Sequence, residues 1–157
     1  MQVREAQVED IDALAQVWFE GWRDAHSAIV PEELARARTY DNLHGRLVNE
    51  LAEVRVVGDV GKPLGFSMTK DDELYQLYVS REARGTGAAQ KLIAEVEERL
   101  TSRGIATAWL GCAIGNDRAA RFYERSGWHL ARNYIVELPV PKGIFKLEVW
   151  RYEKDLA

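Results

Sequence analysis

Cysteine is almost absent from this sequence of 157 residues, in which Cys112 is the only one. A single thiol excludes an internal disulfide and a metal site built from several cysteines. Histidine is also scarce, and His26, His44 and His129 do not show the spacing of metal ligands. We therefore expect no bound metal.

Long apolar runs are missing as well. The longest stretch without a charged residue, residues 104–116, is far shorter than the roughly 20 residues that cross a bilayer. The N-terminus carries Arg4, Glu5, Glu9 and Asp10 at positions where a signal peptide would be apolar. These features predict a cytoplasmic protein without a membrane partner.

Basic residues are fewer than acidic ones: the sequence has 21 lysines and arginines and 25 aspartates and glutamates, which gives a formal net charge of −4. Nucleic acids and anionic membranes bind to basic faces, so this balance argues against either as the main partner. The apolar and charged shares, 46% and 29%, are those of a globular protein able to build a core. No repeat or linker interrupts the chain, so we expect a single domain over residues 1–157.

Hydrophobic periodicity alternates between strand and helix along the chain. The pattern predicts strands at residues 3–7, 51–60, 64–69, 73–79, 107–114, 128–140 and 145–152. It predicts helices over residues 9–29, over 31–49 as one helix or two short ones, from the mid-80s to Gly104, and over 116–126. Because a helix separates the strands at 73–79 and 107–114, a right-handed crossover should make them parallel neighbours. The expected fold is α/β, a mixed sheet in the order β-α-α-β-β-β-α-β-α-β-β with a parallel central strand pair flanked by helices.

Two of these helices carry a clear apolar stripe. The stripe of the first helix consists of Ile11, Leu14, Ala15, Trp18 and Trp22. The stripe of the helix that ends at Gly104 consists of Ala89, Leu92, Ile93, Val96 and Leu100. Glu95 and Arg99, one turn apart, are expected on the outer face of that helix.

The stretch 73–89 joins an apolar strand to a glycine-rich turn and the start of a helix. Gly85 and Gly87 permit backbone torsions and a close approach that a Cβ would obstruct. The first amides of a helix lack partners and point outward with the positive end of the dipole, so this turn should bind an anion such as phosphate. Two common nucleotide-binding loops do not fit. A Walker loop needs Lys-Ser or Lys-Thr after the glycines, and none follows here; the Rossmann pattern needs a third glycine where Gln90 stands.

Two short motifs occur in a fixed order along the chain. Residues 84–89, RGTGAA, match the pattern R/Q-x-x-G-x-G/A, and residues 116–128, NDRAARFYERSGW, match N-x-x-A-x-x-F-Y-x-x-x-G-F/W at every fixed position. One predicted helix and one predicted strand separate them. In these motifs and in the order of its elements, the chain resembles the GNAT superfamily of acyl-CoA-dependent N-acyltransferases.

The resemblance implies an N-acetyltransferase that moves an acetyl group from acetyl-CoA directly to a primary amine on a small molecule or a peptide, with a homodimer as a candidate assembly. The backbone of Leu77, Tyr78 and Val79 would pair with the pantetheine arm of acetyl-CoA. The other cofactor contacts that the resemblance implies come from the two motifs: Arg84, Gly85, Thr86, Gly87, Ala88, Ala89 and Asn116. The spacing of Asn116, Ala119 or Ala120, and Tyr123 puts them on one face of a helix.

The resemblance also implies two catalytic groups. Tyr123 would lie beside the thioester sulfur and act as general acid for the departing thiolate. Glu73 would be the general base that takes a proton from the acceptor ammonium, directly or through water. Because Glu73 follows Asp71 and Asp72, a solvated acidic turn is an equal alternative. Cys112 has no histidine nearby in the sequence and is expected in the core rather than as a nucleophile.

Strand alternation predicts that the side chain of Glu73 shares a face with three other residues of its strand, Tyr75, Leu77 and Val79. The acceptor pocket implied by the resemblance lies between the first two helices and the last strands. The first helix contributes a cluster of aromatic and polar residues, most of whose aromatics are expected in the core: Trp18, Phe19, Glu20, Trp22, Asp24, His26 and Ser27.

The negative net charge favours a cationic acceptor, and so do the acidic residues expected near this pocket: Glu20, Asp24, Asp71, Asp72 and Glu73. Two other functions are open on the residues alone. One is a non-catalytic acyl-CoA-binding sensor or regulatory module, and the other is a phosphate or nucleotide binder unrelated to CoA.

Overall fold

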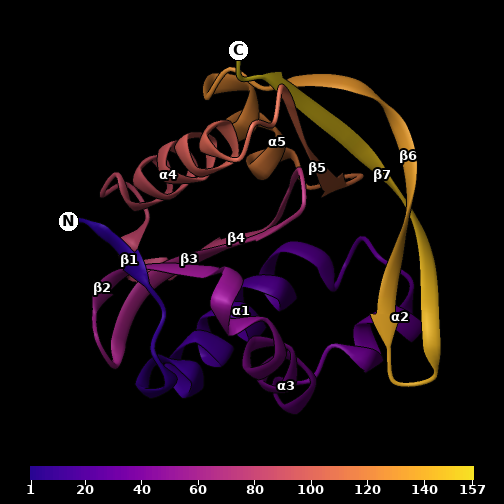
Figure 1. Ribbon diagram of the computed structural model, residues 1–157. Helices are drawn as coiled ribbons and strands as arrows, with labels where there is room; N and C mark the ends of the chain where they lie inside the picture. The colour runs from indigo at the N-terminus through magenta and orange to yellow at the C-terminus, as the bar shows by residue number, and fades with distance from the viewer.

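Seven strands form one mixed sheet in the computed structural model, which describes residues 1–157 (Figure 1). Their order across the sheet is β1 (Val3–Glu5), β2 (Val54–Asp59), β3 (Lys62–Lys70), β4 (Glu73–Val79), β5 (Thr107–Ala113), β7 (Gly143–Asp155) and β6 (His129–Val140). Only β4 and β5 run parallel, and every other neighbouring pair is antiparallel. The α/β fold class with its parallel central pair is therefore confirmed.

Five α-helices cover the two faces of this sheet (Figure 1). On one face lie α1 (Ile11–His26), α2 (Glu32–Ala37) and α3 (Tyr40–Glu50), and on the other lie α4 (Ala88–Ser102) and α5 (Asp117–Arg125). Residues 31–49 thus form two helices, and the Thr39 hydroxyl caps the second by accepting a hydrogen bond from the Asn42 amide at 3.0 Å. No helix is long and apolar enough to cross a bilayer.

Each face of the sheet packs its own core. The predicted stripe of α1 is buried in full: Ile11, Leu14, Ala15, Trp18 and Trp22. The stripe of α4 is buried as predicted at four positions: Leu92, Ile93, Val96 and Leu100. Its first buried residue is Ala88 and not Ala89, because α4 begins at Ala88 and turns that methyl group toward the sheet.

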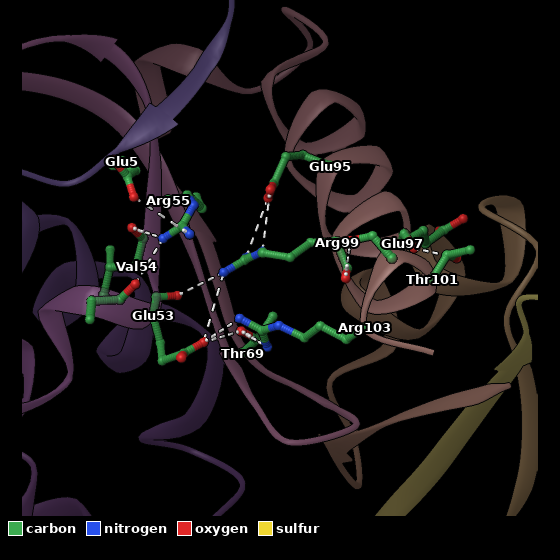
Figure 2. A network of polar contacts seen from close by, with 12 residues as sticks. Glu5, Glu53, Val54, Arg55, Thr69, Glu95, Glu97, Arg99, Thr101 and Arg103 are labelled. Carbon is green, nitrogen blue, oxygen red and sulfur yellow. Dashed lines mark hydrogen bonds and ion pairs between the residues drawn. The ribbon is translucent and has the colours of Figure 1, made fainter. Parts of the chain in front are cut away.

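An ion-pair network holds the C-terminal half of α4 against the sheet (Figure 2). The Arg99 side chain is only 9% exposed and lies between Glu95, one turn earlier, and Glu53, which precedes β2. Arg103 also contacts Glu53, at 3.1 Å, and Glu53 accepts a hydrogen bond from Thr69 on β3. The expectation that Glu95 and Arg99 lie on the outer face is therefore wrong, because Glu53 draws the Arg99 guanidinium toward the sheet.

Asp10 is a fully buried carboxylate where β1, the start of α1 and the turn between β2 and β3 meet. Arg4 donates to both of its oxygens, at 2.8 and 2.9 Å, and the amides of Gln7 and Gly61 donate at 2.8 and 2.9 Å. Burial opposes the charged form, but these donors outweigh it and lower the pKa of Asp10 to about 2. The carboxylate thereby fixes where α1 begins relative to the sheet.

We expect Asp10→Ala to lower the free energy of unfolding by about 2 to 4 kcal/mol, because it leaves the Arg4 guanidinium and two amides without their acceptor. In the unmutated protein, the stabilisation from Asp10 is present above its unfolded-state pKa and is lost as the pH falls from near 4 through about 2, since the folded-state pKa is depressed. Urea unfolding followed by tryptophan fluorescence at several pH values measures both effects. Asp12→Ala removes an exposed carboxylate two residues away and is the matched control. Equal losses in the two variants would contradict the role given to Asp10.

Candidate active site

β4 and β5 diverge soon after they meet. Their only paired residues are Glu73 and Trp109, and the Trp109 amide donates to the Asp72 carbonyl at 3.2 Å. Beyond this point a pocket of about 640 Å³ opens between the two strands, lined by residues 73–78 of β4 and by residues 109 and 111–113 of β5. The edge of β4 that faces β5 is therefore without a strand partner over residues 77–79, where the predicted ligand contacts lie.

A β-bulge changes the direction of the side chains in β4. β3 pairs Met68 with Gln76 and Thr69 with Leu74, so Tyr75 is an extra residue. Tyr75 packs into the core on the α1 side of the sheet, whereas the residues after the bulge resume their alternation in a new phase. The expectation that four residues share one face is wrong for this reason: Glu73, Tyr75, Leu77 and Val79.

The glycine turn has the geometry that an anion site needs. Gly85 and Gly87 have φ values of 77° and 89°, and a Cβ at either position would meet no heavy atom within 4 Å. Thr86 closes the turn by donating its hydroxyl to the Ala83 carbonyl. α4 begins directly after Gly87 with no acidic residue in its first turn, and the amides of residues 87–90 form no hydrogen bond within the protein. These amides point out of the helix as free donors.

Arginines surround the same turn. Arg81 contacts Asp24, at the end of α1, at 2.6 Å, and Arg84 lies 4.0 Å from the same carboxylate. Burial lowers the pKa of Arg84, and the nearby charges of Arg118 and Arg81 lower it further. One carboxylate thus faces three guanidiniums, which favours an anion here. Sequence reasoning did not single out Arg118, although its place in the first turn of the helix after Asn116 was a usable signal.

Helix α5 brings the second motif to the pocket. Asn116, Ala119 and Tyr123 all line it, whereas Ala120 belongs to the core. The side-chain oxygen of Asn116 caps α5 by accepting from the Ala119 amide at 3.4 Å, and its side-chain nitrogen forms no hydrogen bond within the protein. The small side chain of Ala119 leaves open space between the two polar groups.

The pocket holds two protonated groups side by side. Burial raises the pKa of Tyr123 well above its ordinary value, and the neighbouring Cys112 and Tyr78 add to the shift. Burial likewise raises the pKa of Cys112 to about 12. Tyr123 therefore keeps a proton that it can donate, while Cys112 is a buried thiol and not a thiolate nucleophile.

Glu73 lines the pocket at the point where β4 and β5 separate. Burial raises the pKa of Glu73 to about 7, and the charge of Lys70 offsets only part of the shift. The acidic turn before it faces elsewhere, because Asp71 is exposed and Asp72 accepts a hydrogen bond from the Trp109 indole at 3.0 Å. Glu73 is thus a carboxyl group that can exchange a proton near neutral pH.

The β6–β7 hairpin extends past the sheet beside α2 (Figure 1). The first helices and this hairpin line the far end of the pocket. α1, α2 and the segment that joins them contribute Trp22, His26, Val30 and Leu34. The hairpin contributes Tyr134, Ile135, Val136, Glu137, Leu138, Lys146, Leu147 and Val149. This end is therefore mainly apolar, with charged groups at its rim.

Only two of the residues expected in the acceptor region from the first helix, Trp22 and His26, reach this pocket. Burial lowers the pKa of His26 to about 4, so its imidazole is neutral at physiological pH. Glu20 accepts a hydrogen bond from Gln16 on the surface of α1, and Asp24 pairs with arginines at the glycine turn. Neither carboxylate contributes negative charge to the pocket. No group of three or more His, Cys, Asp or Glu side chains is placed to hold a metal ion.

Sequences similar to this chain include N-acetyltransferases. A family model described as the acetyltransferase (GNAT) family matches residues 11–128. YuaI, an uncharacterized N-acetyltransferase of Bacillus subtilis, is 29% identical over an alignment of 119 positions that covers 69% of this chain and 69% of that protein.

Solved structures with a similar fold are also acetyltransferases. A GCN5-related N-acetyltransferase from Rhodopseudomonas palustris superposes with a TM-score of 0.74 at 20% identity, over 98% of this chain and 94% of that one. A putative acetyltransferase from Salmonella typhimurium, solved with its cofactor acetyl-CoA, superposes with a TM-score of 0.71 at 18% identity, over 100% of this chain and 94% of that one. At these identities the likeness shows a shared fold.

Proposed function

Because the chain belongs to the acetyltransferase (GNAT) family and is an acyltransferase, we propose that it transfers an acetyl group from acetyl-CoA directly to a primary amine. The observation that carries the proposal is the gap between β4 and β5, whose walls bear both Tyr123 and Glu73. The choice of acetyl-CoA as donor is supported by the similarly folded acetyltransferase from Salmonella typhimurium, whose structure contains it.

The residues around the gap fit an extended donor with a phosphate group at one end. The free edge of β4 over residues 77–79 offers backbone N–H and C=O groups to the amides of the pantetheine arm, as an added strand would use them. The free amides of residues 87–90, together with Arg84 and Arg118, suit the pyrophosphate. The unpaired side-chain nitrogen of Asn116 is a further donor beside the gap.

Two side chains divide the chemistry of transfer. When bound, acetyl-CoA supplies a thioester carbonyl as the electrophile. Glu73 takes a proton from the acceptor ammonium, so that the nitrogen lone pair is free to attack. Tyr123, which stays protonated, donates its proton to the departing thiolate. Because Cys112 is also protonated and buried, the acyl group passes directly from donor to amine without an enzyme-bound thioester.

Acetyl-CoA should raise the melting temperature of the protein, because a ligand that binds only the folded state stabilises it by mass action. Gly87→Trp should abolish the shift, since the indole would occupy the space in front of the free amides. Gly104→Trp is the matched control, because Gly104 has a similar φ of 81°, equally open surroundings and a place at the other end of α4. Differential scanning fluorimetry compares the three proteins. A full shift in folded Gly87→Trp would contradict the assignment of the turn.

Tyr123→Phe should retain the affinity for CoA and slow acetyl transfer by about 10²-fold, the lower end expected for the loss of one general acid. Calorimetry with CoA and thiol release with an amine acceptor measure the two properties separately. Tyr40→Phe removes a hydroxyl that contacts the Asp12 carbonyl outside the pocket and serves as control. Full activity in Tyr123→Phe would mean that water protonates the thiolate.

The value of kcat/KM should rise with pH through one ionisation near 7, because Glu73 acts as a base only when deprotonated and its pKa is raised to about 7. Glu73→Gln should lose about 10²-fold of the rate at neutral pH and regain part of it at high pH, where more of the amine is already free. Asp71→Asn removes an exposed carboxylate whose charge has the smallest of the effects on the pKa of Glu73, so it should keep the single ionisation and move it only slightly to lower pH. An equal loss in Glu73→Gln at every pH would indicate a role in binding or structure instead.

A further inference from the structure

Tyr75 lies among three cationic side chains that form no ion pair. Nη2 of Arg46 donates to the Tyr75 hydroxyl at 2.7 Å, and its guanidinium carbon lies 5.6 Å from the centroid of the ring. Nζ of Lys70 lies 5.4 Å from the same centroid. The third cation, Arg38, is near enough to Arg46 for the charge of Arg46 to lower its pKa. No carboxylate of the protein neutralises any of the three through direct contact.

Arg38 is the most buried of these cations, with 4% of its surface exposed. It donates to the Pro139 carbonyl at 2.7 Å and to the Asn42 side chain at 3.3 Å, so it ties the β6–β7 hairpin to α3. Burial and the charge of Arg46 lower its pKa to about 10, which still leaves it protonated at neutral pH. The hydrogen bonds explain how the hairpin is held, but they leave the charge uncompensated. Buried charge without a counter-ion is costly, so a nearby anion would stabilise Arg38, whereas Lys70 is exposed to solvent.

The pocket gives such an anion access to the cluster. Tyr75 and Lys70 both line it, at the end where Glu73 lies. The Tyr75 hydroxyl accepts from Arg46 and donates to no group of the protein, so its proton is free for an acceptor in the pocket. A hydroxyl polarised by a guanidinium is a stronger donor than an isolated one. Tyr75, Lys70 and the charge of Arg46 therefore form a subsite for a carboxylate.

The neighbouring groups limit what else the ligand can carry. Glu73 and Tyr75 are two residues apart on β4, so an amine at one and a carboxylate at the other can belong to one small molecule. A purely cationic amine would leave the cations beside Tyr75 without a counter-charge, and a dicarboxylate would add negative charge to a pocket whose lining already includes Glu73 and Glu137. The apolar lining from α2 and the hairpin suits an apolar side chain: Val30, Leu34, Leu138 and Leu147.

We infer that the acceptor is an α-amino acid with an apolar side chain, whose carboxylate binds at Tyr75 and Lys70, with Arg46 behind Tyr75, while its amine faces Glu73. This inference rests on the proposed acetyl transfer and names the acceptor class of the same site. It replaces the cationic acceptor that the acidic residues of the sequence favoured, because Glu20 and Asp24 do not reach the pocket.

Pairs of amines that differ only in the carboxylate test the inference: L-leucine against 3-methylbutylamine, and L-phenylalanine against 2-phenylethylamine. We expect kcat/KM, expressed per concentration of free amine, to favour the amino acid by about 10-fold or more, the effect of one hydrogen bond to a charged group. Tyr75→Phe and Lys70→Met should each lower this ratio by about 10-fold. Tyr40→Phe and Lys62→Met also remove a hydroxyl and an ammonium group, but away from the pocket, and should leave the ratio unchanged.

A ratio of kcat/KM values near one would overturn the inference, and so would a ratio that Tyr75→Phe and Lys70→Met leave unchanged. Transfer to the simple amines would in either case still support the proposed function. Absence of thiol release with all four amines would speak against the proposed function instead. In that case thermal shifts with CoA and the acetylated compounds decide the matter. The carboxylate subsite is supported if N-acetyl-L-leucine raises the melting temperature more than N-(3-methylbutyl)acetamide does, and if this difference is smaller in Tyr75→Phe. Equal shifts with the two compounds overturn it.

Discussion

The separation of β4 from β5 is the constraint on which the rest of the structure depends. Each of these strands keeps a full partner on its other side, because β4 pairs with β3 and β5 pairs along its whole length with β7. The two halves of the sheet can therefore diverge without losing the hydrogen bonds that hold them. Only the facing edges give up partners, and a ligand with amide groups can restore them.

The surrounding elements fix the groups that face this gap. Arg99 and Arg103 hold the C-terminal half of α4 against the sheet (Figure 2). The first turn of this helix and its free amides are thereby kept in place after β4. α5 begins at the capped Asn116 and directs Tyr123 into the pocket from the β5 side. The bulge at Tyr75 turns that side chain toward Arg46 and leaves Glu73 at the fork between the strands. Positive charge thus gathers at two places, the glycine turn and the surroundings of Tyr75, with the proton-transfer groups between the strands.

The sequence predicted the elements well because their signals are local. Apolar stripes, the capping residue Asn116 and the glycines of the turn act within a few residues, and the structure has helices and strands where they indicate them. The insertion of β7 between β5 and β6 could not be read in this way, since it depends on pairing between strands far apart in the chain. The bulge also left no signal, because Tyr75 and its neighbours are compatible with either phase of a buried strand.

The residues of the candidate site that belong to motifs could be predicted from the sequence. Those that come together from distant parts of the chain could not. The second motif marked Asn116 and Tyr123, and both line the pocket. Arg46 reaches Tyr75 from α3, and nothing in the sequence connects it to β4. The acidic residues suggested a negative pocket, but Asp24 is neutralised by arginines outside it. Charge counted along a chain does not show which charges meet in space.

Amide chemical shifts, recorded by NMR while acetyl-CoA is added, test the central claim most directly. If the gap between β4 and β5 holds the donor, the largest changes will be at residues 77–79 on the free edge of β4 and at residues 87–90 at the start of α4. Residues of the ion-pair network between α4 and β3 should change little, because they lie at the opposite end of α4 (Figure 2). Saturable binding that leaves both 77–79 and 87–90 unperturbed would contradict the account.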